Sequence, residues 1–214
     1  MVQTFSALEA FPKIRHAFVQ RVREVDVVTD RDEAIRRLQP THAEILRRIG
    51  FYQVRHAEQV HGNVVEVVTS SSPQPSNGAD GLITAEPGLA LCIYVADCAA
   101  VYLVDKHARC LGLVHSGRRG SELGIAGVAL RRMQADFGVD PADVVIQVSP
   151  CIRPPLYEVD FAALIRDNCL AHGVLPQNYH DCGACTGSDL GTHYSYRMEK
   201  GFTGRMAAYL GLIS

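Results

Sequence analysis

The stretch that decides the fold runs from Ala96 to Arg119 and reads ADCAAVYLVDKHARCLGLVHSGRR. It contains two short apolar runs, at 99–104 and 110–114, on either side of a polar turn, a pattern typical of two paired, buried strands. If the runs pair antiparallel, the start of the first lies beside the end of the second. Cys98, which precedes the first run, and His115, which follows the second, are therefore expected at the same edge of the sheet.

Outside this stretch, short apolar segments alternate irregularly with segments of helical periodicity. This order predicts an α/β (α+β) fold, with residues 1–214 forming a single domain in which helices flank a mixed sheet. Pro40 is expected to separate two helices, because proline breaks a helix interior, and Gly50 and Gly138 are expected to end helices. The expected strands are 14–19, 51–60, 64–68, 82–84, 89–95 and 144–148, and the expected helices are 31–38, 43–49, 122–137, 161–171 and 203–210.

The composition is that of a folded protein for which we expect neither a nucleic-acid nor a membrane partner. Hydrophobic residues make up 47% of the 214 residues and charged residues 21%, which allows a sizeable core. The formal net charge of −2 gives no electrostatic reason for nucleic-acid binding. No apolar stretch approaches the roughly 20 residues of a membrane span, and signal-peptide features are lacking. The seven cysteines are therefore expected to be free or metal-bound in a cytoplasmic protein.

Three residues next to turns, His61, Cys98 and His115, form a candidate metal site. Two imidazoles and one thiolate are a three-ligand zinc set that leaves a fourth position for water, and bound zinc lowers the pKa of that water towards ~7. Two other interpretations stay open. Cys98 is either a small buried hydrophobe with the histidines at the surface, or a nucleophile activated by a histidine, with Asp97 completing a triad.

Two further motifs have both a functional and a structural interpretation. Gly117-Arg118-Arg119-Gly120 precedes an expected helix, where glycine and arginine suit a phosphate, but a solvated turn explains the same residues. Cys182-Gly183-Ala184-Cys185 has the spacing of a redox pair or half a zinc site. No second pair occurs at zinc-ribbon spacing, so packing is the favoured interpretation of these two cysteines.

Six motifs occur in a fixed order along residues 50–214. They are Gln59-Val60-His61-Gly62; Ala79-Asp80-Gly81-Leu82-Ile83-Thr84; Ala96-Asp97-Cys98; His115-Ser116-Gly117-Arg118-Arg119-Gly120; Ser149-Pro150-Cys151-Ile152 with Tyr157-Glu158-Val159; and Tyr194-Ser195-Tyr196-Arg197 with Gly204-Arg205. Together they resemble the YfiH-like laccase-domain family, whose members are named polyphenol oxidase, peptidoglycan editing factor and purine nucleoside phosphorylase. The ordered set is far more specific than any one motif.

The resemblance implies a YfiH-like α/β domain with zinc held by His61, Cys98 and His115, which are then also the expected catalytic residues. It implies phosphorolysis of purine nucleosides, methylthioadenosine included, with adenosine deamination as a companion reaction. The expected partners are small molecules, a purine nucleoside and phosphate, and the expected state is a monomer or homodimer. The residues expected to bind substrate or phosphate are Gln59, Asp97, Arg119 and Arg197.

Two alternatives come with the same family. The laccase name implies copper and polyphenol oxidation, but two histidines and a cysteine do not supply the several copper centres of a multicopper oxidase. The second alternative is a weakly active binding or quality-control factor in peptidoglycan precursor editing, and two departures favour it. Arg118 stands where the family usually has tryptophan, and the N-terminal region lacks the family's Gly-Gly-x-Ser and Ser-x-Asn-x-Gly segments.

Overall fold

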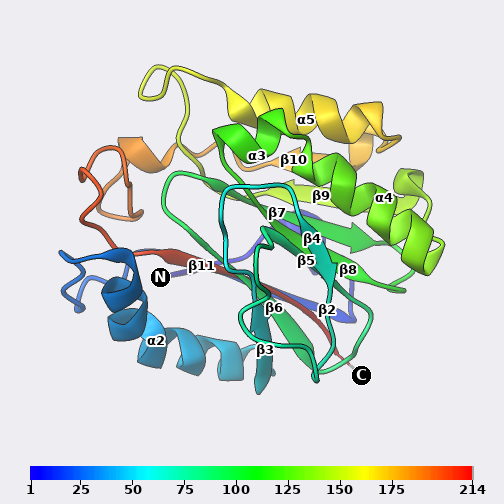
Figure 1. Cartoon of the computed structure of the whole chain (residues 1–214), viewed down its shortest axis with the longest axis horizontal. Coiled ribbons are helices and arrows are strands. Elements are labelled where there is room, and N and C mark those ends of the chain that lie inside the picture. Colours follow the sequence, from blue (N-terminus) through cyan, green and yellow to red (C-terminus); the bar gives the residue numbers. More distant parts are fainter. Residues whose placement is uncertain (214) are drawn as a thin grey trace.

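Two mixed sheets stack face to face, and helices cover their outer faces (Figure 1). The computed structural model describes residues 1–213. The first sheet has the strand order β1 (Val2–Gln3), β2 (Ile14–Val19), β11 (Met206–Leu212), β6 (Leu89–Val95), β3 (Gln53–His56). The second has the order β10 (Tyr179–Asp181), β9 (Val144–Val148), β7 (Ala99–Asp105), β8 (Leu111–Ser116), β5 (Gly81–Thr84), β4 (Val65–Val67). The helices are α1 (Ser6–Glu9), α2 (Arg31–Arg48), α3 (Arg118–Glu122), α4 (Ile125–Phe137) and α5 (Phe161–Ala171), with short 3-10 turns at Pro141–Asp143, Pro176–Asn178 and Thr186–Ser188.

The main core lies between the two sheets. It joins Phe18 of β2 and Leu91 of β6 to Tyr102 of β7 and Leu113 of β8, all fully buried. The Tyr102 hydroxyl donates to the Ala17 carbonyl at 3.1 Å, so the one polar atom of this ring is satisfied across the sheets. A second core lies between the second sheet and helices α4 and α5, and a smaller one lies between the end of α2 and the first sheet. The fold class expected from the sequence is confirmed.

The expected pairing of the two central strands is present. Strand β7 pairs antiparallel with β8, with Ala99 opposite Ser116 and Ala100 opposite His115. All seven residues of β7 are buried, because β8 and β9 flank the strand and cores cover both of its faces. The turn 96–98 connects β6 of the first sheet to β7 of the second. Cys98 and His115 therefore lie together at the edge where the chain crosses between the sheets.

Pro40 does not divide α2. The prediction of separate helices at 31–38 and 43–49 is wrong, because one helix runs from Arg31 to Arg48. Asp30 caps its N-terminus by accepting from two backbone N–H groups. The buried residues recur every four positions on one face: Ala34, Leu38, His42 and Leu46. Packing of this continuous face outweighs the single backbone hydrogen bond that the proline removes.

The prediction of a helix at 203–210 is also wrong. The segment contributes to β11, which lies between β2 and β6 and pairs antiparallel with both. Alanine, methionine and leucine favour a helix when taken alone. In the sheet interior, however, both neighbours satisfy the backbone groups of β11, and all of its residues are buried. Tertiary burial therefore overrides the local preference.

Two other element boundaries differ from expectation. The expected strand at 51–60 is shortened to Gln53–His56, after which the chain turns through Gln59, whose φ is +67°. The expected helix at 122–137 begins only at Ile125, because Gly124 adopts a left-handed conformation with a φ of +69°. The two arginines of the Gly-Arg-Arg-Gly motif stand in the preceding short helix, α3.

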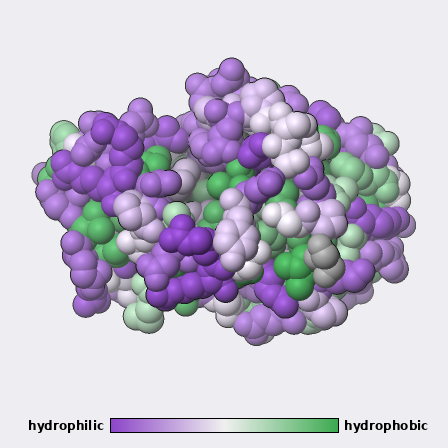
Figure 2. Space-filling view, turned by 90° about the horizontal axis from the view of Figure 1, so that it is seen from below, coloured by the Kyte–Doolittle hydropathy of each residue, from purple (hydrophilic) through white to green (hydrophobic). Residues whose placement is uncertain are grey.

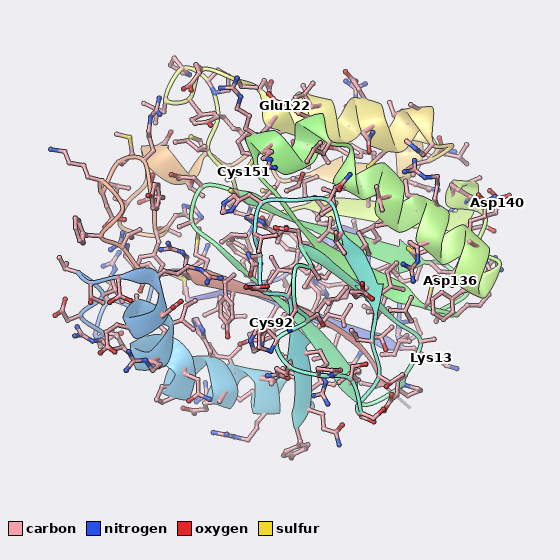
Figure 3. All side chains as sticks on the ribbon, viewed as in Figure 1. Lys13, Cys92, Glu122, Asp136, Asp140 and Cys151 are labelled. Atoms are coloured by element: carbon pink, nitrogen blue, oxygen red, sulfur yellow. The ribbon has the colours of Figure 1, made fainter. Side chains whose placement is uncertain are left out.

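None of the seven cysteines forms a disulfide, as expected for free thiols. The face shown in Figure 2 is mostly hydrophilic, with hydrophobic residues in small groups. Within residues 1–213, no helix is long and apolar enough to cross a membrane. All seven cysteines are free, and Cys92 and Cys151, labelled in Figure 3, are buried. Cys182 packs against the main core and Cys185 against the second, consistent with the packing interpretation of that pair.

Candidate metal centre

Three side chains from distant parts of the chain meet where β6 turns into β7. His61 comes from the loop after β3, Cys98 from the β6–β7 turn and His115 from β8. Their possible ligand atoms all lie within 4.8 Å of one another. The two imidazole rings stand nearly perpendicular, at 84°, with centroids 4.8 Å apart. Within the described residues, this is the one group of three or more His, Cys, Asp or Glu side chains that could hold a metal ion.

Asp80, which no sequence pattern marked as a site residue, holds two of these side chains in place. Its fully buried carboxylate lies 2.8 Å from Nδ1 of His115. It also accepts from the backbone N–H groups of His61 at 2.9 Å and Gly62 at 2.7 Å. The contact with Nδ1 leaves the other ring nitrogen of His115 for the Cys98 side. In metal sites such a carboxylate fixes the tautomer and orientation of a ligating histidine.

The clustered groups shift one another's pKa values. Burial alone raises the pKa of the Cys98 thiol, but the positive charge of His115 and hydrogen bonds from both histidines outweigh burial and lower this pKa to about 6. Burial acts to lower the pKa of His115, whereas the Cys98 thiolate and the hydrogen bond to Asp80 raise it overall. The thiolate of Cys98 is therefore favoured near neutral pH, and the thiolate is the form that ligates a metal or acts as a nucleophile.

Gly117 provides the space that the cluster occupies. A Cβ at this position would lie 2.5 Å from Sγ of Cys98 and 4.0 Å from Cδ2 of His61. The φ of Gly117 is −94°, which other residues adopt readily, so the need for glycine is one of space. Two imidazole nitrogens and a thiolate, with a carboxylate behind one imidazole, fit a tetrahedral zinc that keeps one position open.

The cluster lies in a pocket of about 1020 Å³. This volume is near the upper end of the roughly 300–1,000 Å³ typical of small-molecule sites. Aromatic rings line it: Tyr94, Tyr157, Phe161 and Tyr196. Its cations outnumber its acids: Arg31, Arg118, Arg119, Arg197, Lys200 and Arg205 against Asp97 and Glu122. The pocket therefore suits a planar ligand with negative charge.

Gln59 and Asp97 line this pocket and use their side chains to hold its backbone. Nε2 of Gln59 donates to the Tyr94 carbonyl at 2.6 Å, and Oε1 accepts from the Tyr94 N–H at 2.9 Å. The Asp97 carboxylate accepts from the Thr186 hydroxyl and from the backbone N–H of Arg197, both at 2.7 Å. Gln59 and Asp97 have φ values of +67° and +80°, a strained conformation that clusters at functional sites. Their expected contact with substrate stays a prediction.

Three arginines that line the pocket, Arg118, Arg119 and Arg197, differ in their partners. Arg118 pairs with Glu122 at 2.9 Å and reaches Glu158 at 3.8 Å. Arg197 pairs with Glu158 at 2.7 Å. Arg119 is exposed, lines the pocket and has no ion pair among residues 1–213. On this side of the pocket, Arg119 is therefore the cation free to receive an anion.

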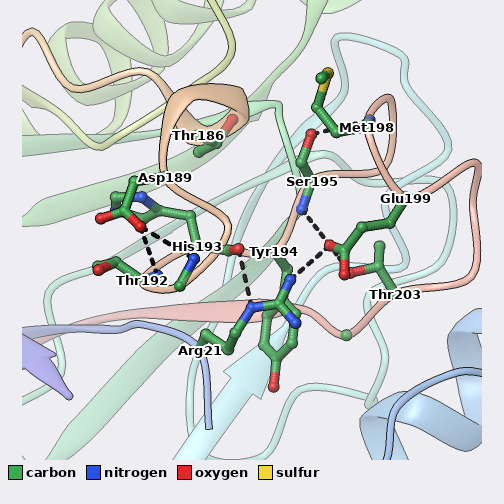
Figure 4. Close-up of polar contacts among 12 residues, drawn as sticks. Arg21, Thr186, Asp189, Thr192, His193, Tyr194, Ser195, Met198, Glu199 and Thr203 are labelled. Carbon is green, nitrogen blue, oxygen red and sulfur yellow. Dashed lines mark hydrogen bonds and ion pairs between the residues drawn. The ribbon is translucent and has the colours of Figure 1, made fainter. Parts of the chain in front are cut away.

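A polar network fixes the loop that carries Tyr196 and Arg197 to the pocket (Figure 4). The Arg21 guanidinium lies 2.6 Å from Oε2 of Glu199. The same carboxylate oxygen accepts from the Ser195 N–H at 3.0 Å and the Thr203 hydroxyl at 2.6 Å. Because Arg21 comes from the segment after β2, the N-terminal region supports this wall of the pocket.

Comparison with known proteins identifies the family of the chain. The family described as multi-copper polyphenol oxidoreductase laccase matches residues 24–163 and 159–213. The chain belongs to this family, which confirms the resemblance seen in its motifs.

Named proteins and solved structures that are similar to this chain agree with the family assignment. Purine nucleoside phosphorylase YlmD of Geobacillus stearothermophilus is 30% identical over 194 residues, 72% of this chain and 70% of that protein. The purine nucleoside phosphorylase of Deinococcus radiodurans is 31% identical over 230 residues, 93% of this chain and 89% of that protein. The crystal structure of Geobacillus YlmD superposes with a TM-score of 0.84 at 25% identity, covering 95% and 93% of the two chains. Bacillus licheniformis YfiH, at 21% identity and a TM-score of 0.82 over 95% and 94%, shares the fold.

Proposed function

We propose that this protein is a zinc-dependent purine nucleoside phosphorylase that also cleaves methylthioadenosine and deaminates adenosine. The observation that carries the proposal is the cluster of His61, Cys98 and His115 in an aromatic pocket that also contains the unpaired Arg119. The names of the relatives at about 30% identity support an enzyme of this kind. The nitrogen and sulfur donors support zinc, although copper accepts similar ligands.

Each part of the pocket has a task in this reaction. Tyr157 and Tyr196, which are not fully buried, offer faces against which a planar purine stacks. Arg119 presents a fork of N–H donors that matches phosphate geometry. In phosphorolysis a phosphate oxygen bonds to C1′ of the ribose while the bond from C1′ to the purine nitrogen breaks. Arg119 therefore orients the attacking group, and such orientation supplies a large part of the rate.

The cluster serves the companion deamination. Bound zinc supplies a Lewis acid and lowers the pKa of water, the chemistry needed at the purine C6. His61, Cys98 and His115 would hold the metal, and Asp80 keeps a proton on Nδ1 of His115 so that the other nitrogen can ligate. A ligating Cys98 is not free to act as a nucleophile, so the two roles of this thiolate are alternatives.

The test is a product assay on purified protein loaded with zinc. Inosine or adenosine is incubated with inorganic phosphate, and chromatography detects free base and deaminated nucleoside. We expect free base only when phosphate is present, and we expect Arg119→Gln to lower its rate at least tenfold. Arg166→Gln is the matched control, because Arg166 is an exposed arginine on α5 outside the pocket. Absence of both free base and deaminated product from every purine nucleoside would end the proposal.

The alternatives are tested on the same samples. A multicopper oxidase needs several copper centres, and the residues that the structure describes offer one cluster, which favours the nucleoside reaction. A binding factor for peptidoglycan precursors would bind muropeptide fragments in calorimetry without turning over nucleosides, and ordinary turnover would rule it out. We further propose a cytoplasmic location and a monomeric or dimeric state, which fractionation and size-exclusion chromatography test.

A further inference from the structure

Arg205 is a buried cation in the pocket wall without an acidic partner. It is 8% exposed and lines the pocket. Nη1 donates to the carbonyls of Thr203 and Gly204, both at 2.9 Å. Its Nε and Nη2 donate no hydrogen bond within residues 1–213, and its Cζ lies 5.9 Å from the centroid of the Tyr196 ring. A desolvated charge without a counterion is costly, so this guanidinium is poised to receive an anion.

Arg31 adds a second positive charge on the same side. Its guanidinium reaches Asp32, which is largely exposed, at 3.4 Å, and donates to the Glu58 carbonyl at 3.1 Å. Burial lowers the pKa of Arg205, and repulsion from Arg31 lowers it further. Both residues line the same pocket, so together they bring two positive charges to it.

The nearby carboxylates are already occupied. Asp97 accepts from Thr186 and from the backbone of Arg197. Glu199 is bound by Arg21 and Thr203. Neither forms an ion pair with Arg31 or Arg205 in the described part of the chain. Asp97 and the Cys98 thiolate attract Arg205 only through space, so its guanidinium has no acidic group in direct contact.

The elements that carry Arg31 and Arg119 lie on opposite sides of the two sheets. Arg119 is on α3, above the second sheet, whereas Arg31 begins α2, which covers the first sheet (Figure 1). Phosphorolysis of an uncharged nucleoside needs one anion position, for the attacking phosphate. The pocket offers two positions, one at Arg119 and one at Arg205 with Arg31.

We propose that the preferred substrate carries a phosphate of its own, as a purine nucleoside 5′-monophosphate, with this phosphate on Arg205 and Arg31. The inference rests on the proposed phosphorolysis and names its substrate class. The bond from C1′ to N9 breaks, and an oxygen of inorganic phosphate bonds to C1′. N9 takes the proton released by that phosphate, so the products are the free base and ribose 1,5-bisphosphate, with no oxidation or reduction.

The test compares inosine 5′-monophosphate with inosine, both in turnover and in calorimetric binding without inorganic phosphate. We expect kcat/KM and affinity to be at least tenfold higher for the nucleotide. Arg31→Gln should reduce this ratio at least fivefold, and Arg205→Gln should reduce it further if circular dichroism shows that this buried variant folds. Arg36→Gln is the control, because Arg36 is on the same helix, pairs with Glu33 and lies outside this pocket.

The outcomes separate this inference from the proposed function. Tighter nucleotide binding that Arg31→Gln weakens supports the anion position even if neither compound is cleaved, a result that would end the phosphorolysis proposal alone. Equal binding and equal turnover of the two compounds would overturn the inference. It would equally be overturned if Arg31→Gln left the ratio unchanged and instead raised the KM for inorganic phosphate with inosine.

Discussion

Replacement of Gly117 by alanine tests the metal centre through one added methyl group. The new Cβ would lie 2.5 Å from Sγ of Cys98, about 1–1.5 Å inside the roughly 3.5–4.0 Å of an ordinary contact. Either the thiolate leaves its position or α3 moves, whereas metal–ligand distances tolerate only about 0.2 Å. Overpacking of this kind costs about 1–3 kcal/mol, which corresponds to a roughly 5- to 150-fold weaker zinc affinity.

Competition of the purified variant with a chromophoric chelator measures this affinity. The matched control is Gly112→Ala on β8, where the new Cβ would meet nothing closer than 3.4 Å. We expect the control to bind zinc as the unmodified protein does, and Gly117→Ala to remain folded by circular dichroism while it loses metal. A zinc affinity for Gly117→Ala within twofold of the unmodified protein would refute the assignment of Cys98 as a ligand.

The remaining predictions concern ligands, the supporting carboxylate and a buried histidine. Cys98→Ala leaves two ligands, so zinc content and activity should be lost while the fold survives. His61→Ala and His115→Ala should lose zinc in the same way. Full zinc content in all three variants would refute the metal site. Asp80→Asn should weaken zinc affinity about 10- to 100-fold, measured by the same competition, whereas unchanged affinity would deny the carboxylate its supporting role. His42 is buried with both ring nitrogens unpartnered, and burial lowers its pKa from 6.5 to about 4. As the pH falls from 6.5 towards 4, the unfolded chain therefore binds a proton at His42 that the native state does not bind. This difference lowers the free energy of unfolding by about 2 kcal/mol near pH 5. His42→Leu should remove this loss of stability at low pH, which urea unfolding at a series of pH values measures. If the free energy of unfolding depended on pH as it does in the unmodified protein, the buried neutral state of His42 would be contradicted.

The sequence alone determined the central strand pair and its consequence for the site. The runs 99–104 and 110–114 are apolar on both faces, and the polar turn between them allows only a short antiparallel connection. Local pattern therefore suffices to bring Cys98 and His115 together. Residue type and motif order supplied His61 as the third member, although spacing by itself gave no reason for it to meet the other two.

Only the tertiary structure decided how the site is held and what surrounds it. Asp80 belongs to one of the six motifs but was not an expected site residue, and its role depends on burial against His115, which no local pattern encodes. Arg31 and Arg205 are far apart in the chain and line the same pocket only because the fold brings the start of α2 and the segment before β11 to it.

The same physics explains the two wrong elements. The β11 segment has a helical composition, yet pairing with β2 and β6 on both edges makes it a strand. Pro40 should end a helix, yet the apolar face of α2 continues past it and buries against the first sheet. Local propensities amount to less than about 1 kcal/mol per residue for ordinary residues, whereas burial of one large apolar side chain contributes about 1.5–3 kcal/mol. Sequence pattern therefore determines structure where neighbours in the chain are also neighbours in space, and packing decides wherever distant segments meet.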